Sequence, residues 1–319
     1  MYQREYNGIN SFLVNTAKLL LAEGKKRIVR NEECYELTEP YMFKIKNPLA
    51  REITINERNW NKSLAYAESL WIATGRNDLE YIKHYLERMK EFSDDGIFLR
   101  GGYGPRLRHY NGDKDDYKFS GYTLKEGVDM FRYVVDCFQE DSNTRRAIIT
   151  LGDNNKDCFD ENGKLKNTKD IPCTRELHFI KQSENDKLDL VVHMRSNDFI
   201  WGASAVNVFN YTYMQEYMSA ILGLDIGNYY HIVDNFHYYS WHKDLVETLA
   251  SINKYEEKPL CLKKTFDSLG SFDSLLKKLS IEENKMRTEK NFYREIHFED
   301  PFFDNWYNVL LDFNFAKCA

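Results

Sequence analysis

The stretch from residue 171 to residue 198 reads IPCTRELHFIKQSENDKLDLVVHMRSND, and its pattern is typical of a β-hairpin. Residues 176–182 and 188–196 each read as a strand, and the polar letters SEND between them favour a turn. The hairpin places a Pro-Cys pair at the mouth of one strand. It places the letters MRSND at the end of the other.

Outward from this hairpin, the pattern predicts helices and further strands on both sides. Helices are expected over 8–23, 60–74, 77–92, 124–141 and 206–222, and extended segments over 33–46, 145–152 and 229–239. No internal repeat or long linker interrupts this order, so it predicts an α+β fold with its strands concentrated in the second half. We expect one domain over residues 1–319, with the residues after about 250 as a divergent C-terminal appendage.

Composition narrows the class of protein without naming its chemistry. The 319 residues are 42% hydrophobic and 29% charged, which is typical of a globular chain. A bilayer-spanning helix needs about 20 apolar residues, and no run approaches that length, so a cytoplasmic protein is expected. The formal net charge of −6 argues against broad nucleic-acid binding. Six scattered cysteines without metal-ligand spacing predict neither a disulfide scaffold nor a metal site.

Four segments carry side chains that suit catalysis or phosphate binding. A cysteine nucleophile needs a nearby cation that holds it as a thiolate, and Arg195 in MRSND is placed to serve Cys173. The pair Arg145 and Arg146 suits a dianionic phosphate because guanidinium forks match its oxygens. The segment HYYSWH at 237–242 is the fourth. Taken singly, such patterns are more often packing or a solvated face, and only their joint order points to a site.

In that joint order the motifs resemble those of thymidylate synthase, from about residue 27 to about residue 245. The resemblance implies a three-layer fold in which a mixed central sheet is flanked by helices, and a homodimer formed through the sheet. It implies that Cys173 is the nucleophile that attacks the pyrimidine of a nucleoside monophosphate. Glu68 of an E-x-L-W segment is then the proton relay, and Tyr103 with Gly104 serves the removal of the C5 proton.

The resemblance also implies which residues hold the nucleotide. Asn207 reads the edge of the base, and the histidine-x-tyrosine motif that holds the sugar hydroxyl corresponds to His237 and Tyr239. The phosphate is held by Arg195, Ser196 and Arg30, with Arg27 as the alternative to Arg30. Arg145 and Arg146 are donated across the dimer to the partner's phosphate.

Methylenetetrahydrofolate is the co-substrate that the resemblance implies, with Asp198 on its pterin ring. The expected folate side further comprises Trp71, Met89, Phe92, Trp201 and Gly202. At Met89 and Phe92 the family carries two tryptophans that shield the exocyclic methylene while hydride is transferred. Without them, water can add and leave a hydroxymethyl group, unless Trp201 is a substitute shield. Changes at Thr174, His178 and 193–194, and the absence of the family's closing tail, favour the same outcome.

These departures resemble the hydroxymethylase branch of the family, including the cytidylate enzymes of pyrimidine-antibiotic pathways. We therefore expect 5-hydroxymethylation of a pyrimidine nucleoside monophosphate, with CMP favoured and dCMP as a further candidate. An asparagine amide can present either its carbonyl or its NH2 group, so Asn207 leaves the base open. Two alternatives remain, which are thymidylate synthesis from dUMP by hydride transfer and a non-catalytic nucleotide or RNA binder.

Overall fold

The computed structural model describes residues 1–112, 116–119, 126–289, 292 and 295–318. The described chain divides into two compact units. Unit 1 comprises Met1–Asn61, Cys173–Ser219 and Leu224–Cys261; unit 2 comprises Lys62–Pro172, Ala220–Gly223 and Leu262–Ala319. Mixed sheet and helices give the α+β class that the sequence predicts. Within the described ranges, no helix is both long and apolar enough to cross a membrane.

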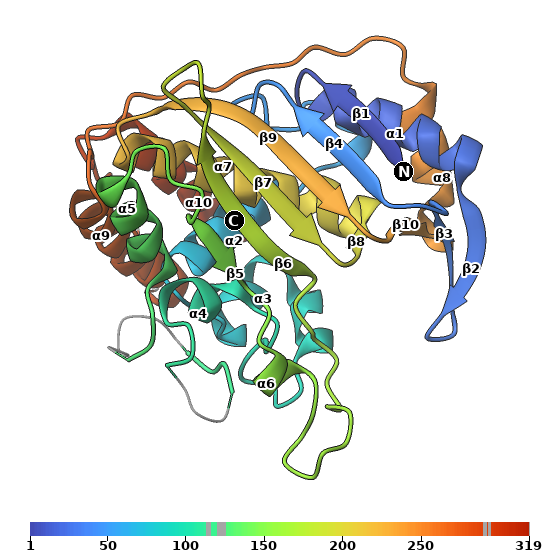
Figure 1. The fold of residues 1–319 in the computed structure, drawn as a ribbon, viewed down its shortest axis with the longest axis horizontal. Coiled ribbons are helices and arrows are strands. Elements are labelled where there is room, and N and C mark those ends of the chain that lie inside the picture. Colours follow the sequence, from blue (N-terminus) through green and yellow to red (C-terminus); the bar gives the residue numbers. More distant parts are fainter. Residues whose placement is uncertain (113–115, 120–125, 290–291, 293–294, 319) are drawn as a thin grey trace. The chain divides into compact units, whose positions relative to one another are not determined.

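Unit 1 is built on a five-stranded mixed sheet in the order β1-β4-β9-β7-β6. Parallel pairs β1–β4 and β9–β7 alternate with antiparallel pairs β4–β9 and β7–β6 (Figure 1). The strands are β1 (Tyr2–Tyr6), β4 (Tyr41–Ile45), β6 (Thr174–Lys181), β7 (Lys187–Met194) and β9 (Asp225–Val233). The hairpin expected from residues 171–198 is thus confirmed as β6 and β7.

A second sheet of unit 1 has the order β2-β3-β10-β8 and carries several predicted site residues. Its strands are β2 (Lys25–Val29), β3 (Glu32–Glu36), β8 (Asn197–Asp198) and β10 (Phe236–Tyr239). The single strand expected over 229–239 was wrong, because the chain ends β9 at Val233 and enters β10 in the other sheet at Phe236. Between the two strands, the backbone N–H of Asp234 donates to the carbonyl of Met194, and the carbonyl of Asn235 accepts from the backbone N–H of Asn197.

The helices of unit 1 are α1 (Ile9–Glu23), α7 (Val208–Ile221) and α8 (Lys243–Ser251), although the last residues of α7 belong to unit 2. Helix α7 packs against the five-stranded sheet, since the Gln215 amide donates to the carbonyls of Leu188 in β7 and Asn228 in β9. On the same side, Phe12 of α1 contacts Phe43 of β4 at a centroid distance of 4.5 Å. The apolar core of unit 1 therefore lies between the sheet and these helices.

Unit 2 is mostly helical. It contains α2 (Lys62–Ala73), α3 (Leu79–Tyr85), α4 (Tyr103–Arg108), α5 (Met130–Glu140), α6 (Asn154–Asp157), α9 (Leu269–Thr288), α10 (Pro301–Cys318) and the short strand β5 (Ile148–Thr150). The continuous helix expected over 77–92 was wrong, because Leu86 is extended and separates α3 from a 3-10 helix at Glu87–Phe92. The helix expected over 124–141 begins only at Met130, capped by Asp129, while residues 124–125 lie outside the described ranges.

The residues after about 250, expected as an appendage, divide between the units. Residues 252–261 run along unit 1, where the Glu257 carboxylate accepts hydrogen bonds from the backbone of Asn10 and Ser11 at the start of α1. The later residues form α9 and α10 of unit 2. There the indole of Trp306, fully buried, donates to the carbonyl of Tyr66 in α2 at 2.8 Å.

Candidate active site

Cys173 directly precedes β6 and lies beside the end of β7. Its carbonyl accepts a hydrogen bond of 2.9 Å from the backbone N–H of Arg195, so the antiparallel pairing of the hairpin brings the two residues together. Cys173 is half-buried and Arg195 is exposed. The sequence-predicted pair of nucleophile and cation is therefore adjacent in the backbone of one hairpin.

Asp198 begins the next feature, a π-helix over Phe199–Asn207 that the sequence pattern missed. Its side chain accepts from the backbone N–H of Trp201 and so caps this helix. The other carboxylate oxygen, Oδ2, is buried and has no hydrogen-bond partner among the described residues. Burial raises the pKa of this carboxyl, while nearby His237 acts in the opposite direction. An unsatisfied buried acceptor of this kind suits a ligand that brings its own N–H donor.

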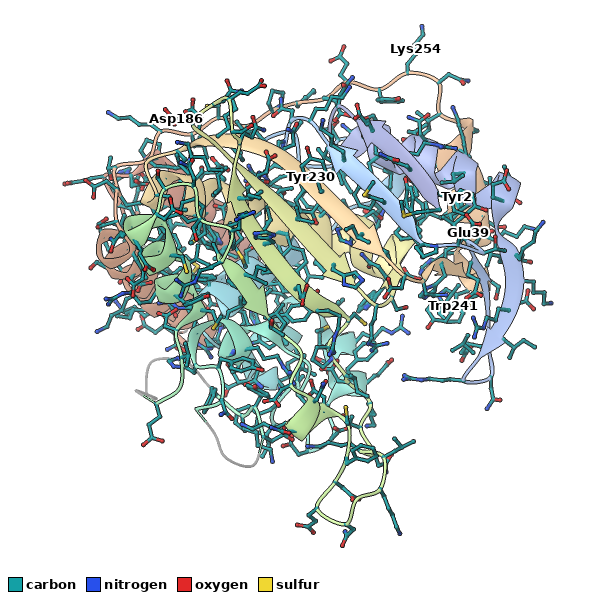
Figure 2. All side chains as sticks on the ribbon, in the orientation of Figure 1. Tyr2, Glu39, Asp186, Tyr230, Trp241 and Lys254 are labelled. Carbon is teal, nitrogen blue, oxygen red and sulfur yellow. The ribbon has the colours of Figure 1, made fainter. Side chains whose placement is uncertain are left out.

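His237 and Tyr239 lie on β10, which pairs with β8 so that His237 is opposite Asp198. Burial lowers the pKa of His237, which favours the neutral imidazole, and its Nδ1 is buried without a partner among the described residues. The ring of Tyr239 contacts that of His237 edge to face at 5.3 Å and is stacked on Trp241 at 4.4 Å. Figure 2 labels Trp241 beside this sheet, and the indole is half-exposed. The two predicted sugar ligands therefore form one aromatic cluster with Trp241.

Arg30 lies at the tight turn between β2 and β3, where Arg30 and Asn31 both have positive φ values of 51° and 66°. Two consecutive residues of this kind are typical of a type I′ hairpin turn. Arg30 is exposed and close enough to Tyr239 to lower that phenol's pKa, although burial is the larger influence and raises it. Arg27, the alternative, is instead engaged with Glu36 at 2.9 Å. Arg27 is thus held by a carboxylate of the neighbouring strand, whereas Arg30 lies near Tyr239.

Asn207 ends the π-helix and is half-buried. Its amide Nδ2 donates to Oδ1 of Asn197 at 3.0 Å and lies 3.7 Å from the sulfur of Met194. Gly202, predicted on the folate side, leaves room for these amides, because a Cβ there would lie 2.2 Å from Oδ1 of Asn197. Ser196, predicted to bind phosphate, is half-buried with its hydroxyl 3.5 Å from Oδ1 of Asn235.

The remaining predicted residues belong to unit 2. Glu68 is buried in α2, and Trp71, one turn further, is buried with its indole bonded to the carbonyl of Asp78 at 3.1 Å. Tyr103 begins α4, and its neighbour Gly104 must be glycine because a Cβ would lie 2.1 Å from the carbonyl oxygen of Arg76.

The other unit 2 positions lie nearer the surface. Met89 and Phe92 are half-buried in the 3-10 helix that follows α3. Arg145 and Arg146 are exposed just before β5, and the Arg146 guanidinium contacts Glu140 at 3.2 Å. Exposure is what a residue needs if it is to reach another molecule.

Sequence reasoning missed Asn197, His231 and Trp241. Asn197 was the unassigned letter of the Arg-Ser-x-Asp motif, and Trp241 lay unassigned within HYYSWH. Nothing in the local pattern marked His231, because the contact of its side chain with Asn197 in another strand depends on tertiary packing.

The family model for thymidylate synthase matches residues 14–291, so the chain belongs to the thymidylate synthase family. Members of this family transfer a one-carbon unit from methylenetetrahydrofolate. The chain is 35% identical over 221 residues to the deoxyuridylate hydroxymethyltransferase of Bacillus phage SP01, covering 69% of this chain and 54% of the relative. It is 30% identical over 230 residues to the deoxyuridylate hydroxymethyltransferase of Pseudomonas phage M6, covering 72% and 59%.

A thymidylate synthase from Bacillus licheniformis is 26% identical over 216 residues, covering 65% of this chain and 68% of the relative. The chain thus spans little more than half the length of the two phage relatives. The family resemblance inferred from Cys173 and its neighbouring motifs is confirmed, and the two phage relatives are named as hydroxymethyltransferases.

Proposed function

We propose that this chain hydroxymethylates carbon 5 of deoxyuridine monophosphate, with methylenetetrahydrofolate as the one-carbon donor. The observation that carries the proposal is the order of the similarities. The two phage deoxyuridylate hydroxymethyltransferases are 35% and 30% identical to it, and the thymidylate synthase is 26% identical. The products of the two reactions differ, because hydroxymethylation consumes water and releases tetrahydrofolate, whereas thymidylate synthesis oxidises the folate.

In this proposal Cys173 adds to carbon 6 of the pyrimidine and thereby makes carbon 5 nucleophilic. Its position at the hairpin mouth next to Arg195 supports the role, because a neighbouring cation stabilises the thiolate. Family resemblance assigns the proton relay to Glu68 and removal of the C5 proton to Tyr103. The burial of Glu68 keeps bulk water from its carboxyl, which suits a residue that passes protons to a bound substrate.

The nucleotide ligands follow from the same assignment. We assign the sugar hydroxyl to His237 and Tyr239. Nδ1 of His237 supports this assignment, because it is buried with no hydrogen-bond partner in the described part of the chain and a hydroxyl would satisfy it. Arg30, Arg195 and Ser196 bind the phosphate in this scheme. Asn207 reads the base through its carboxamide.

The residues of unit 1 fit a pterin ligand. Oδ2 of Asp198 is a buried acceptor with no partner among the described residues, and a pterin ring presents N–H donors. Bound folate supplies the one-carbon unit. Asp198 orients it, and its capping bond to Trp201 holds the carboxylate in place.

Met89 and Phe92 support the addition of water to the exocyclic methylene as the last step. The family carries shielding tryptophans at these two positions. Both side chains lie half-buried in the 3-10 helix of unit 2. Neither presents an indole that would keep water from the reacting carbon. Thymidylate synthesis, with Trp201 as the shield, is the alternative. The identity of the product distinguishes the two reactions.

The outer face of the five-stranded sheet, defined by Val191, Tyr230, Ile232 and Met42, supports a homodimer formed through this sheet. The strand register places Val191 beside Tyr230, and Ile232 beside Met42, all half-buried. Figure 2 labels Tyr230 on β9, and Figure 1 shows α7 behind the same strands. A partly apolar sheet face of this kind suits a second copy of the chain. Arg145 and Arg146 then reach the partner's phosphate.

The identity of the base, uracil or cytosine, is a separate question from the reaction type. The sequence favoured CMP, but the phage relatives reported above are named for deoxyuridylate, and deoxyuridylate is therefore the substrate proposed here. CMP and dCMP are the competing substrates that the test includes.

The test is mass spectrometry of dUMP, UMP, dCMP and CMP after incubation with the enzyme and methylenetetrahydrofolate. A gain of about 30 mass units, one CH2O, on dUMP is the expected result, and Cys173→Ser abolishes it. The same gain confined to CMP would replace the substrate but keep the reaction. A gain of about 14 units with release of dihydrofolate would establish thymidylate synthesis instead.

A further inference from the structure

A chain of hydrogen bonds runs from Asn207 into the core of unit 1. Nδ2 of Asn207 donates to Oδ1 of Asn197 at 3.0 Å, and Nδ2 of Asn197 lies 3.3 Å from Nε2 of His231. Nδ1 of His231 is 2.6 Å from the hydroxyl of Tyr229. Asn197 is 3% exposed, and His231 and Tyr229 are fully buried, so water does not compete for these bonds.

The protonation state of His231 limits the directions that these hydrogen bonds can take. Complete burial lowers the pKa of His231 to about 3, so the imidazole is neutral and has one donor and one acceptor nitrogen. Because Nδ2 of Asn197 can only donate, Nε2 of His231 must accept, and Nδ1–H then donates to Tyr229. Every bond in this arrangement has one donor and one acceptor.

The same hydrogen bonds in the opposite direction would also pair every donor with an acceptor. Both amides would then be flipped, and His231 would have its other tautomer. The sulfur of Met194 distinguishes the two arrangements. It lies 3.3 Å from Nδ2 of Asn197 and 3.7 Å from Nδ2 of Asn207, and a thioether sulfur only accepts. Flipping the amides would turn two carbonyl oxygens toward this sulfur. Met194 therefore favours the observed direction.

From this geometry we propose that Asn197 is a positioning residue that selects the base, because it holds the amide of Asn207 in one of its two orientations. Uracil and cytosine present opposite donor and acceptor patterns at N3 and at position 4. An amide held in one orientation matches one of these patterns and opposes the other. The selection of the base therefore depends on Asn197, which acts through Asn207. The inference rests on the proposed function in one respect only, that Asn207 faces the pyrimidine edge.

Calorimetric binding of dUMP and dCMP without folate tests this inference, since both nucleotides have the same sugar. Wild type is expected to prefer one base, and Asn197→Leu to reduce the ratio of the two Kd values by about tenfold or more, because the amide becomes free to flip. Met194→Leu preserves volume and removes the acceptor, so a smaller reduction in the same direction is expected. Asn185→Leu, in the exposed turn between β6 and β7, is the control and leaves the ratio unchanged.

The ratio is measured within one preparation, so partial loss of folded protein does not change it. Equal weakening of both nucleotides in Met194→Leu and in folded Asn197→Leu would overturn the inference, and Met194→Leu alone decides if Asn197→Leu does not fold. A wild type that binds both bases equally would also overturn it. Wild type binding neither nucleotide would overturn the proposed function and this inference together, whereas unchanged selectivity in the variants overturns only the inference.

Discussion

His231 is a single residue whose chemistry is controlled by its surroundings. Its imidazole is fully buried in β9, stacked on Phe43 at 4.8 Å and bonded to Tyr229 and Asn197. Burial removes water from the charged form, and nearby His193 adds repulsion, so the pKa falls to about 3. An unfolded chain restores an ordinary pKa near 6.5. The difference couples folding to pH.

The sign of this coupling follows from which state binds the proton. Between pH 6.5 and 3 the unfolded chain protonates this histidine and the folded chain does not, so acid lowers the free energy of unfolding. His231→Gln removes that proton while retaining polar groups. When the pH falls from 6.5 to 5, we expect the free energy of unfolding of the variant to decrease by about 2 kcal/mol less than that of wild type.

Urea unfolding at the two pH values measures the difference. The control is His297→Gln, because His297 is exposed and its replacement should leave the pH dependence of stability as in wild type. Parallel pH profiles for His231→Gln and wild type would refute the assignment of acid sensitivity to this residue.

At the scale of elements, α10 is the helix whose role the family comparison does not describe. The family model ends at residue 291, and α10 begins at Pro301. Its Trp306 is fully buried and bonded to Tyr66 of α2, and the Asn305 amide donates to the Tyr66 hydroxyl at 3.1 Å. Helix α2 carries Glu68 two residues further on, so α10 supports the helix of the proposed proton relay.

Truncating Trp306 should therefore destabilise unit 2. For Trp306→Ala we expect a loss of about 3–5 kcal/mol in the free energy of unfolding, because a large cavity opens and the Tyr66 carbonyl loses a donor. Trp306→Phe should cost less, since the ring volume is partly retained. Phe315→Ala, on the same helix with 39% exposure, should cost under about 1 kcal/mol. Equal losses at positions 306 and 315 in denaturant titrations would show that α10 does not support α2 in this way.

At the scale of the whole molecule, the proposed homodimer makes a specific demand on the active site. If Arg145 and Arg146 serve the partner's phosphate, one intact cysteine and one intact arginine pair in different protomers suffice for turnover. Mixing inactive Cys173→Ser with inactive Arg146→Ala should then restore up to about a quarter of wild-type activity by statistical subunit exchange.

The same assembly can be tested without catalysis. Val191→Asp places a charge in the outer face of the sheet and should convert the dimer to monomer in light scattering. Ile281→Asp, at a 44% exposed position of α9, is the control and should leave the mass unchanged. Wild-type monomers at micromolar concentration, or hybrids verified by mass that remain inactive, would contradict the shared arrangement.

Local order was largely predictable from the sequence, because the relevant signals are short in range. The patterns over 176–182 and 188–196 predicted β6 and β7, and the helical pattern over 8–23 predicted α1. The predictions failed where local signals conflict with tertiary packing. Residues 229–239 have strand character throughout, yet they are shared between two sheets. The pattern over 77–92 is helical, yet Leu86 is extended.

The sequence by itself determined the family, and it predicted the nucleophile Cys173 and the motif residues around it, since chemistry that needs particular side chains leaves them in a recognisable order. It also predicted that Asn207 reads the base but left its amide orientation open. Only the tertiary structure decided that orientation, because the atoms that hold it belong to Asn197, Met194 and His231, which lie on separate segments. Hydrogen-bond direction depends on which groups meet in a dry core, and that meeting is a property of the folded chain.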